Sequence, residues 1–272
     1  MSLYNYVIIL RIKQRNNFSY IYTLYTYTQG LKDVIVFSNQ KFLLANFKLY
    51  NVYFCIFKKG NPLDQIKHIF PLYYYLAIEQ HPLKTVVWEY LSEFIIYQLY
   101  CQENSKLIYN LLRRTLYHLN ICSEKAILPI LLRSLYFLLK FFGWQPQLYT
   151  CMKTGEKLKI TKNFKYSNIG FSASYGGLVK LGKIHRYEYI GILNQEELYI
   201  FQKIIYLQSH NYNFTIPIKK FNKILIHLEY LLCKYIQYHI GKRMICSIKL
   251  GKIFTERNQY LEKLSMEHYQ FE

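Results

Sequence analysis

The chain has few acidic residues and no closely spaced cysteines. Its 272 residues include 16 Asp and Glu against 35 Lys and Arg, a formal net charge of +19. The six cysteines occur singly, without a C-x-x-C pair, so neither a disulfide framework nor a four-thiolate zinc site is indicated. The eight histidines show no H-E-x-x-H or similar spacing. We therefore expect no metal and no cofactor.

Motifs for catalysis and for membrane insertion are missing as well. There is no G-x-S-x-G elbow, and the pair Glu196-Glu197 is better explained by a helix N-terminus, where negative charge is favoured. The most apolar stretch, 126–142, contains Pro129 and two cations and is shorter than the roughly 20 residues that span a bilayer. The N-terminus does not resemble a signal peptide, and we expect it to be a mature start. The sequence thus predicts neither an enzyme nor a membrane protein.

Positive charge is abundant, mostly toward the two ends. Residues 1–70 carry nine Lys and Arg against two acids, residues 71–150 seven against five, and residues 151–272 nineteen against nine. This distribution favours a polyanionic partner such as nucleic acid. Thirty Tyr and only four Ala indicate an AT-rich genome, so part of the Lys and Tyr content reflects codon usage.

Residues 1–70 show the alternation of β-strands. The expected strands are Val7–Lys13, Tyr20–Thr28, Val34–Phe37, Phe47–Phe57 and Leu63–Ile69. Five short antiparallel strands suit a small barrel of the OB type, and an SH3-like barrel fits almost as well.

From Pro71 the hydrophobic period becomes helical. Residues 71–150 are expected to form a helical bundle, residues 151–185 a basic finger-like insert, and residues 186–272 the helices that complete the domain. The expected helices are Thr85–Tyr100, Lys106–Leu119, one that Ser123 caps and that ends at Gly143, Asn194–Leu207 and Ile218–Ile240. In Lys106–Leu119 the apolar stripe is expected to be Leu107, Ile108, Leu111, Leu112, Leu116 and Leu119. The predicted fold class is α+β: an N-terminal OB-type barrel, then an all-α domain with a finger-like insert.

Cations in the barrel are the candidates for nucleic-acid binding. Arg11, Lys13 and Arg15 share one face of the first strand, opposite a face of Ile8, Leu10 and Ile12. The nearby rings of Tyr20, Tyr22, Tyr25 and Tyr27 are candidates for stacking on bases. The residues expected to contact DNA are Arg11, Lys13, Arg15, Lys32, Lys41 and Lys48, with additional contacts from Lys157, Lys159 and Lys162 of the insert. Solvated surfaces without a partner are the alternative for both groups.

The stretch from Leu135 to Gly177 carries a resemblance to a known family. Gly143-Trp144-Gln145-Pro146 is followed by Leu148 and Cys151, then by a lysine-rich segment and the pair Gly176-Gly177. This order resembles the RecO family of DNA repair and recombination-mediator proteins, and its Cys-Met-Lys-Thr-Gly version is similar to the cyanobacterial or plastid-type branch. Thr154 and Lys180 stand where many members have further zinc-ligating cysteines. The resemblance thus implies a zinc-free insert.

The resemblance implies a role without enzyme activity. Such a protein binds single- and double-stranded DNA, anneals complementary strands, acts on strands coated by single-strand-binding protein, and helps a RecR-type partner to load a RecA-type recombinase. The expected location is the plastid (chloroplast) stroma with an organelle-encoded gene, or otherwise the bacterial cytoplasm. The alternative is a basic RNA-binding or ribosome-associated organellar protein.

A groove on the helical domain is the expected site for the acidic, apolar tail peptide of the partner. The residues expected to line it are Leu116, Leu131, Leu135, Arg113, Arg114 and Arg133.

Overall fold

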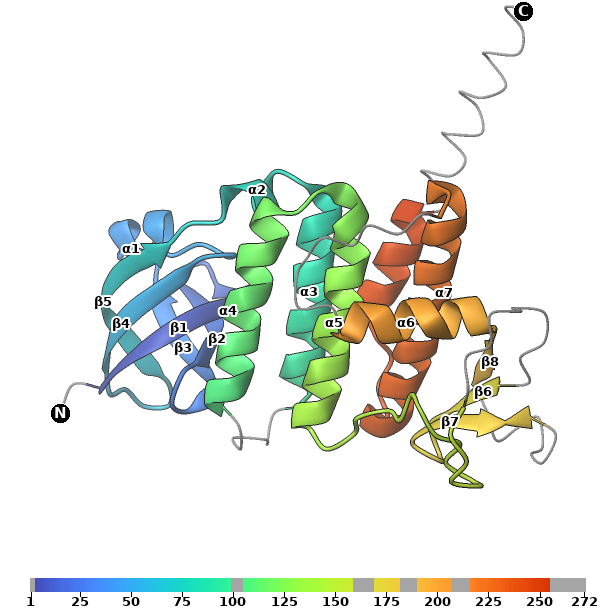
Figure 1. Ribbon diagram of the computed structural model, residues 1–272. Helices are drawn as coiled ribbons and strands as arrows, with labels where there is room; N and C mark the ends of the chain where they lie inside the picture. Colours follow the sequence, from blue (N-terminus) through green and yellow to red (C-terminus); the bar gives the residue numbers. More distant parts are fainter. Residues whose placement is uncertain (1–2, 99–104, 159–168, 182–189, 207–215, 255–272) are drawn as a thin grey trace, which may run out of the picture.

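The computed structural model describes residues 3–98, 105–158, 169–181, 190–206 and 216–254. Figure 1 shows a β-barrel at one end, a layer of helices in the middle and a small sheet at the other end. The predicted fold class, an OB-type barrel followed by a helical domain, is confirmed. In the described ranges no helix is both long and apolar enough to cross a bilayer.

Five strands close the barrel in the order β1-β2-β3-β5-β4. They are β1 (Leu3–Asn16), β2 (Ser19–Thr26), β3 (Gly30–Phe37), β4 (Val52–Lys58) and β5 (Asp64–Tyr73), and the short helix α1 (Lys41–Asn46) joins β3 to β4. β5 leaves its hairpin with β4 and closes the barrel against β3 in parallel, so the expectation of antiparallel pairing throughout is wrong at this one pair. This Greek-key order is that of the OB type.

The fourth strand starts later than the sequence pattern predicts. Phe47 to Tyr50 is a turn rather than the start of a strand, and Tyr50 has a positive φ of 65°. The buried Tyr53 hydroxyl holds this turn, because it accepts the Lys48 N–H at 2.8 Å and donates to the Asn46 carbonyl oxygen at 2.8 Å. At its other end the barrel continues past the expected limit at residue 70, since β5 runs to Tyr73.

Strands β1, β2 and β4 contribute buried side chains to two hydrophobic cores, because successive side chains point to opposite sides of a strand. The barrel interior contains Val7, Ile9, Tyr22, Leu24, Val34 and Val36 among others. Ile8, Leu10, Tyr25 and Val52 point outward and join the core of the helical domain. The barrel and the helices are therefore packed against each other through a continuous apolar layer.

The helical domain is arranged around α5. Its helices are α2 (Leu76–Glu79), α3 (Pro82–Tyr97), α4 (Ser105–Ile121), α5 (Glu124–Phe141), α6 (Gln195–Tyr206) and α7 (Ile218–Ile240), followed by a helical segment at 245–254. α5 contacts α3, α4, α6 and α7, which explains why it is apolar on nearly every side. α4 lies between α5 and the barrel (Figure 1).

Helix boundaries agree with the capping signals in the sequence. Asn194 and Glu197 form a capping box: the Glu197 N–H donates to Asn194 Oδ1 at 2.8 Å, and the Asn194 N–H donates to Glu197 Oε2 at 2.9 Å. Gly241, with a φ of 69°, ends α7 in the left-handed conformation expected of a C-terminal glycine. The stripe predicted for α4 is wrong at Leu107, which is 51% exposed, whereas Leu111 is half-buried and packs against the core.

A three-stranded sheet occupies the far end of the molecule. It consists of β6 (Ile169–Ser172), β7 (Gly177–Lys180) and β8 (Gly191–Leu193) in the order β7-β6-β8, so its last strand lies beyond residue 185, the expected end of the insert. The Gly176-Gly177 pair has a close-packing role: a Cβ atom on Gly177 would lie 2.5 Å from the Gln147 carbonyl oxygen. Only glycine allows the chain after α5 to bridge to β7 here.

Candidate nucleic-acid interface and helical groove

A β-bulge in β1 turns Arg11 and Lys13 outward, and a second register shift, between Gln14 and Asn16, falls at the exposed Arg15. The register shifts between Ile9, which pairs with Leu24, and Arg11, which pairs with Thr23, so Leu10 is the extra residue. Without this bulge Arg11 would point into the barrel like Ile9. The structure instead leaves the side chains of Arg11, Lys13 and Arg15 exposed along the outside of the strand.

Two further predicted contacts, Lys41 and Lys48, are also exposed on the barrel domain. Asn16 of β1 pairs with Ser19 of β2, which pairs in turn with Phe37 at the end of β3. Lys41 follows at the exposed start of α1. Lys48 is also exposed, in the turn that leads to β4. Arg11 pairs with Thr23 of β2, and Thr23 pairs with Asp33 of β3, so all three lie in one row on the outside of the barrel. One acid therefore interrupts this basic surface.

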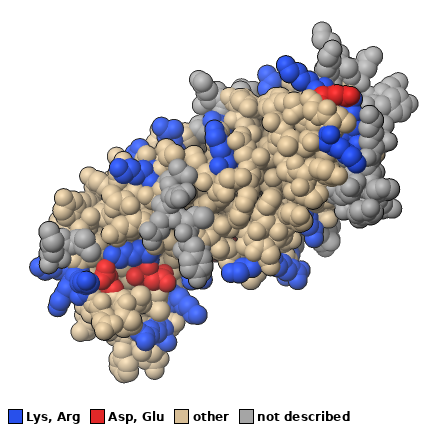
Figure 2. Space-filling model, turned by 90° about the horizontal axis from the view of Figure 1, so that it is seen from below, with Lys and Arg blue, Asp and Glu red and all other residues tan. Residues whose placement is uncertain are grey.

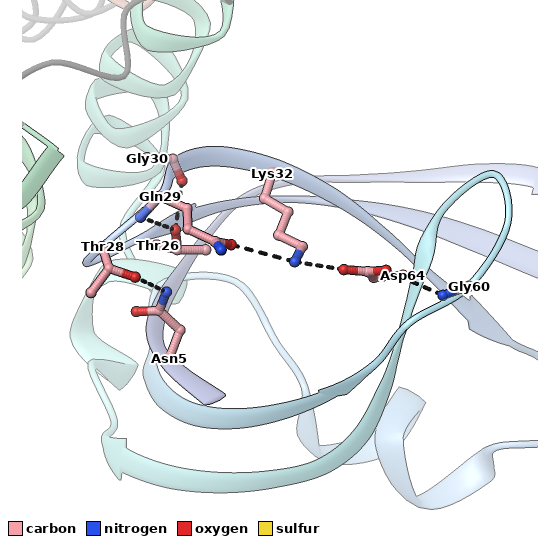
Figure 3. Close-up of polar contacts among 8 residues, drawn as sticks. All are labelled: Asn5, Thr26, Thr28, Gln29, Gly30, Lys32, Gly60 and Asp64. Atoms are coloured by element: carbon pink, nitrogen blue, oxygen red, sulfur yellow. Dashed lines mark hydrogen bonds and ion pairs between the residues drawn. The ribbon is translucent and has the colours of Figure 1, made fainter. Parts of the chain in front are cut away.

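Lys32 differs from the other predicted contacts because its ammonium takes part in polar contacts within the barrel domain, which Figure 3 shows. Lys32 lies on the same side of β3 as Val34 and Val36, whose side chains point into the barrel. Its Nζ lies 4.7 Å from the centre of the Phe57 ring. Its ammonium forms an ion pair with Asp64 at 2.7 Å, and the Asp64 carboxylate also accepts the Gly60 N–H at 3.2 Å. The Lys32 hydrogen bond lowers the pKa of Asp64. Lys32 therefore joins β3 to β5, and we do not include it in the outward basic surface.

The tyrosines expected to stack on bases are mostly structural. Tyr22 and Tyr25 are each 2% exposed, and the Tyr22 ring stacks on Phe47 inside the barrel at 5.1 Å between centroids. The expectation of a stacking platform on these two rings is therefore wrong. Residue type alone did not show which side of β2 each ring would occupy.

The basic surface extends onto the helical domain at a place that the sequence did not indicate. Lys242, just after α7, lies over the Tyr97 ring of α3 at 5.1 Å from its centre. Burial raises the pKa of the Tyr97 phenol, and the positive charge of nearby Arg11 opposes that rise. Lys242 contacts the Tyr97 ring, and Arg11, far away in the sequence, adds positive charge in the same neighbourhood. Figure 2 shows basic side chains over the whole length of one face, with acidic ones confined to small areas.

In the insert, Lys157 is exposed, whereas Lys159 and Lys162 lie outside the described residues. Cys151 is buried, and its sulfur accepts the Lys180 N–H at 3.3 Å. Burial acts to raise the pKa of the Cys151 thiol, but hydrogen bonds from Thr154 and from backbone N–H groups outweigh burial and lower it. Thr154 and Lys180 offer no thiolate to join it, and the described residues contain no group of three His, Cys, Asp or Glu able to hold a metal. The described part of the insert does not fit a zinc ion.

A groove of about 610 Å³ lies between α4 and α5. Its apolar side chains include Leu107, Leu111, Phe137 and Phe141, and its cations are Arg114 and Arg133. The guanidinium of Arg133 lies 5.6 Å from the centre of the Phe137 ring. None of the described residues that line the groove is acidic.

The structure places only part of the predicted set in this groove. Leu116, Leu131 and Leu135 are fully buried in the core and do not line the groove. Arg113 instead lines a smaller hollow with Tyr73, Tyr74 and Tyr75, to which Arg114, Tyr117 and Asn120 also contribute. The predicted set lacks several lining residues, and two of them, Leu107 and Leu111, are the least buried positions of the expected α4 stripe.

Several known proteins are similar to this chain. Residues 80–245 match the family described as "Recombination protein O C terminal". Over 195 residues, which are 71% of this chain and 95% of the relative, it is 60% identical to the "Uncharacterized 24.3 kDa protein in hemA-psbN intergenic region" of Cyanophora paradoxa. It is 25% identical over 216 residues to "DNA repair protein RecO" of Trichodesmium erythraeum, covering 71% of this chain and 73% of the relative. It is 24% identical over 246 residues to "DNA repair protein RecO" of Gloeothece citriformis, which covers 81% of this chain and 86% of the relative.

The family match covers more than half of the chain, and the described fold has an OB-type barrel directly before the matched region. The chain belongs to the RecO (recombination protein O) family.

Proposed function

We propose that this protein is a non-enzymatic DNA-binding protein of DNA repair and homologous recombination. In this proposal it anneals single strands and helps to load a RecA-type recombinase onto strands coated by single-strand-binding protein, together with a RecR-type partner. The observation that carries the proposal is that residues 80–245 match the family and follow a barrel whose first strand has exposed cations. The cyanobacterial relatives named as DNA repair proteins support the same role.

The basic surface is suited to contacts with DNA phosphates. Arg11, Lys13 and Arg15 are spaced along one strand, and Lys41 and Lys48 lie on the adjoining elements. Phosphate contacts of this kind position a protein on nucleic acid without reading its sequence, and each one releases counterions. A protein that anneals strands of any sequence needs binding of this type. Lys157 in the insert adds a further contact in this proposal.

The groove between α4 and α5 is the proposed site for the tail of single-strand-binding protein. A short peptide with carboxylates and apolar side chains would place its apolar part against Phe137 and Leu111 and its charges near Arg114 and Arg133. The absence of acidic side chains among the described lining residues favours such a ligand.

We further propose that the protein works in the plastid stroma and is encoded by the organelle. The relative from Cyanophora paradoxa is described by an intergenic region between hemA and psbN, and the composition of this chain indicates an AT-rich genome. A bacterial cytoplasm is the other location in which the same role would apply.

The proposal is tested by annealing of two complementary labelled oligonucleotides, with and without single-strand-binding protein from the same compartment. We expect faster annealing that persists on coated strands, and loss of most of this acceleration in the Arg11→Glu/Lys13→Glu variant. Absence of any acceleration, with tight binding to RNA of the same length, would refute the proposal in favour of the RNA-binding alternative.

A further inference from the structure

The outer side of β1, β4 and β5 continues beyond the region that the helices cover. Strand pairing aligns Ile8 with Val52, and both are buried against the helical domain. The next outward pairs are Tyr6 with Phe54 and Tyr4 with Ile56. Tyr6 is 46% exposed and Tyr4 is 72% exposed, which shows that no described helix covers these two pairs.

Aromatic rings follow one another across these three strands. The Phe54 ring of β4 is at the centre: it lies 5.4 Å from Tyr6, 5.9 Å from Tyr4 and 6.2 Å from Phe70 of β5, measured between centroids. Phe70 is 50% exposed. We call Tyr4, Tyr6, Phe54 and Phe70 the aromatic face. Its rings are held side by side by strand pairing rather than by a flexible loop.

The aromatic face is bordered by cations. Lys58 shares the outward side of β4 with Phe54, and Lys67 is exposed on β5 beside His68. At the helical border, the Lys106 ammonium lies 5.7 Å from the centre of the Tyr27 ring, which meets Tyr6 edge-on at 6.3 Å. None of the described outward positions on β1, β4 and β5 that surround these rings is acidic.

We infer that the aromatic face binds the unpaired bases of single-stranded nucleic acid by stacking. This inference rests on the proposed function and assigns single strands to a surface distinct from the cations of β1. Exposed rings attract any base because each base has a π-face, and bordering lysines hold the phosphates on either side. The positive border without acids favours a polyanion over a protein segment as the occupant.

Two ligands separate base stacking from phosphate binding. One is an oligothymidylate of about 20 nucleotides, longer than the roughly 4–16 nucleotides that one OB fold covers. The other is an abasic strand with the same number of phosphates. We expect the unaltered protein to bind the oligothymidylate at least about tenfold more tightly than the abasic strand, since stacking of one base on one ring contributes about that factor to the affinity.

The Tyr4→Ala/Phe70→Ala variant should lose this preference while keeping its affinity for the abasic strand and the same dependence on salt. Phe70→Tyr should retain the preference, and Phe70→Leu, which keeps an apolar side chain but no ring, should weaken it. Tyr230→Ala/Tyr238→Ala is the matched control, because these rings are 49% and 61% exposed on α7. Thermal unfolding checks that each variant is folded.

Two outcomes overturn the inference. One is equal affinity of the unaltered protein for the two strands. The other is a preference for bases that survives in Tyr4→Ala/Phe70→Ala, which would place stacking elsewhere. Both still leave DNA binding in place, whereas failure of the proposed function would appear as no useful affinity for either strand.

Discussion

At the scale of single residues, the basic side chains of the barrel have two different roles. Lys32 and Asp64 have side chains only 16% and 18% exposed, and their ion pair joins β3 to the start of β5 (Figure 3). Arg11 and Lys13 have no comparable burial and point into solvent. The role of each cation depends on the side of the strand from which it projects. Lys32 lies on the same, inward side of β3 as Val34, whereas the bulge in β1 turns Arg11 outward.

The Lys32–Asp64 pair predicts a dependence of stability on pH. The pKa of Asp64 is lowered from its usual value of 3.8 by the Lys32 hydrogen bond, so the carboxylate stabilises the fold above that pH and stops doing so as the pH falls through its folded pKa. Asp64→Asn should lower the free energy of unfolding by about 1 kcal/mol at neutral pH. The difference from the unaltered protein should vanish in acid. Denaturant unfolding at several pH values measures both effects.

Asp33→Asn is the matched control for this experiment, because Asp33 is exposed on the strand that carries Lys32. It should change the free energy of unfolding much less than Asp64→Asn does. A pH-independent loss in Asp64→Asn would contradict the assignment, since that result would indicate a packing role for this side chain rather than a charge.

At the scale of elements, Glu93 of α3 caps a helix that is distant in the sequence. Its two carboxylate oxygens accept the N–H groups of Ile245 and Cys246, each at 2.8 Å, at the start of the helical segment 245–254. A carboxylate at a helix N-terminus satisfies free donors and favours the helix dipole. This contact ties the C-terminal segment to α3.

Glu93→Ala should therefore loosen the segment 245–254. We expect a loss of about 1–2 kcal/mol, the usual cost of removing a capping group, and faster amide hydrogen exchange at 245–250 than in the rest of the domain. Glu89→Ala is the control: Glu89 lies one helical turn earlier and pairs with Lys249 at 2.8 Å on the surface, where an ion pair contributes about 0–1 kcal/mol. Equal effects of the two substitutions would rule out the capping role.

The sequence predicted the kinds of elements better than the directions of their side chains. Alternation and helical periodicity identified the barrel strands and α7, and Asn194 and Gly241 were correctly interpreted as helix-end signals. These features depend on residues close together in the chain. By contrast, the parallel pairing of β3 with β5 depends on how the barrel closes, and no local pattern carries that information.

The candidate site shows the same limit. Arg11, Lys13 and Arg15 were correctly expected on an exposed face, but the expected opposite face omitted Val7 and Ile9, which fill the barrel. The one-residue bulge at Leu10 explains how Val7 and Ile9 can point into the barrel while Arg11 and Lys13 point outward. The hydrophobic alternation of the sequence does not indicate this bulge. In α4, Leu107 and Leu111 were counted as core because their spacing fits the stripe, although α5 leaves a groove at their positions.

At the scale of the whole molecule, the proposed binding surfaces belong to different elements. The cations of β1 and the aromatic face lie on the barrel, whereas the groove lies between α4 and α5 of the helical domain. Figure 1 shows α4 between the barrel and α5. Basic side chains extend along the face in Figure 2 from one end to the other. A DNA strand and a peptide could therefore be bound at the same time without competing for the same residues.

This separation predicts that the two activities can be lost independently. Arg114→Glu/Arg133→Glu should weaken binding of an acidic tail peptide from single-strand-binding protein at least about tenfold, because it reverses both cations that line the groove. The same variant should anneal bare strands normally. Arg11→Glu/Lys13→Glu should bind the peptide normally, lose most annealing, and reduce the slope of log affinity against log salt by about two, one for each lost phosphate contact.

Fluorescence anisotropy of the labelled peptide and salt titrations with a labelled strand measure the two effects. Arg113→Glu is the control for the groove, since Arg113 is the neighbouring residue on α4 but lies outside it, in the hollow of Tyr73 to Tyr75. If Arg113→Glu weakens the peptide as much as the groove variant does, the attraction comes from the general charge of α4 rather than from the groove. If each double variant impairs both activities equally, the peptide and the DNA share one surface, and the assignment of separate surfaces fails.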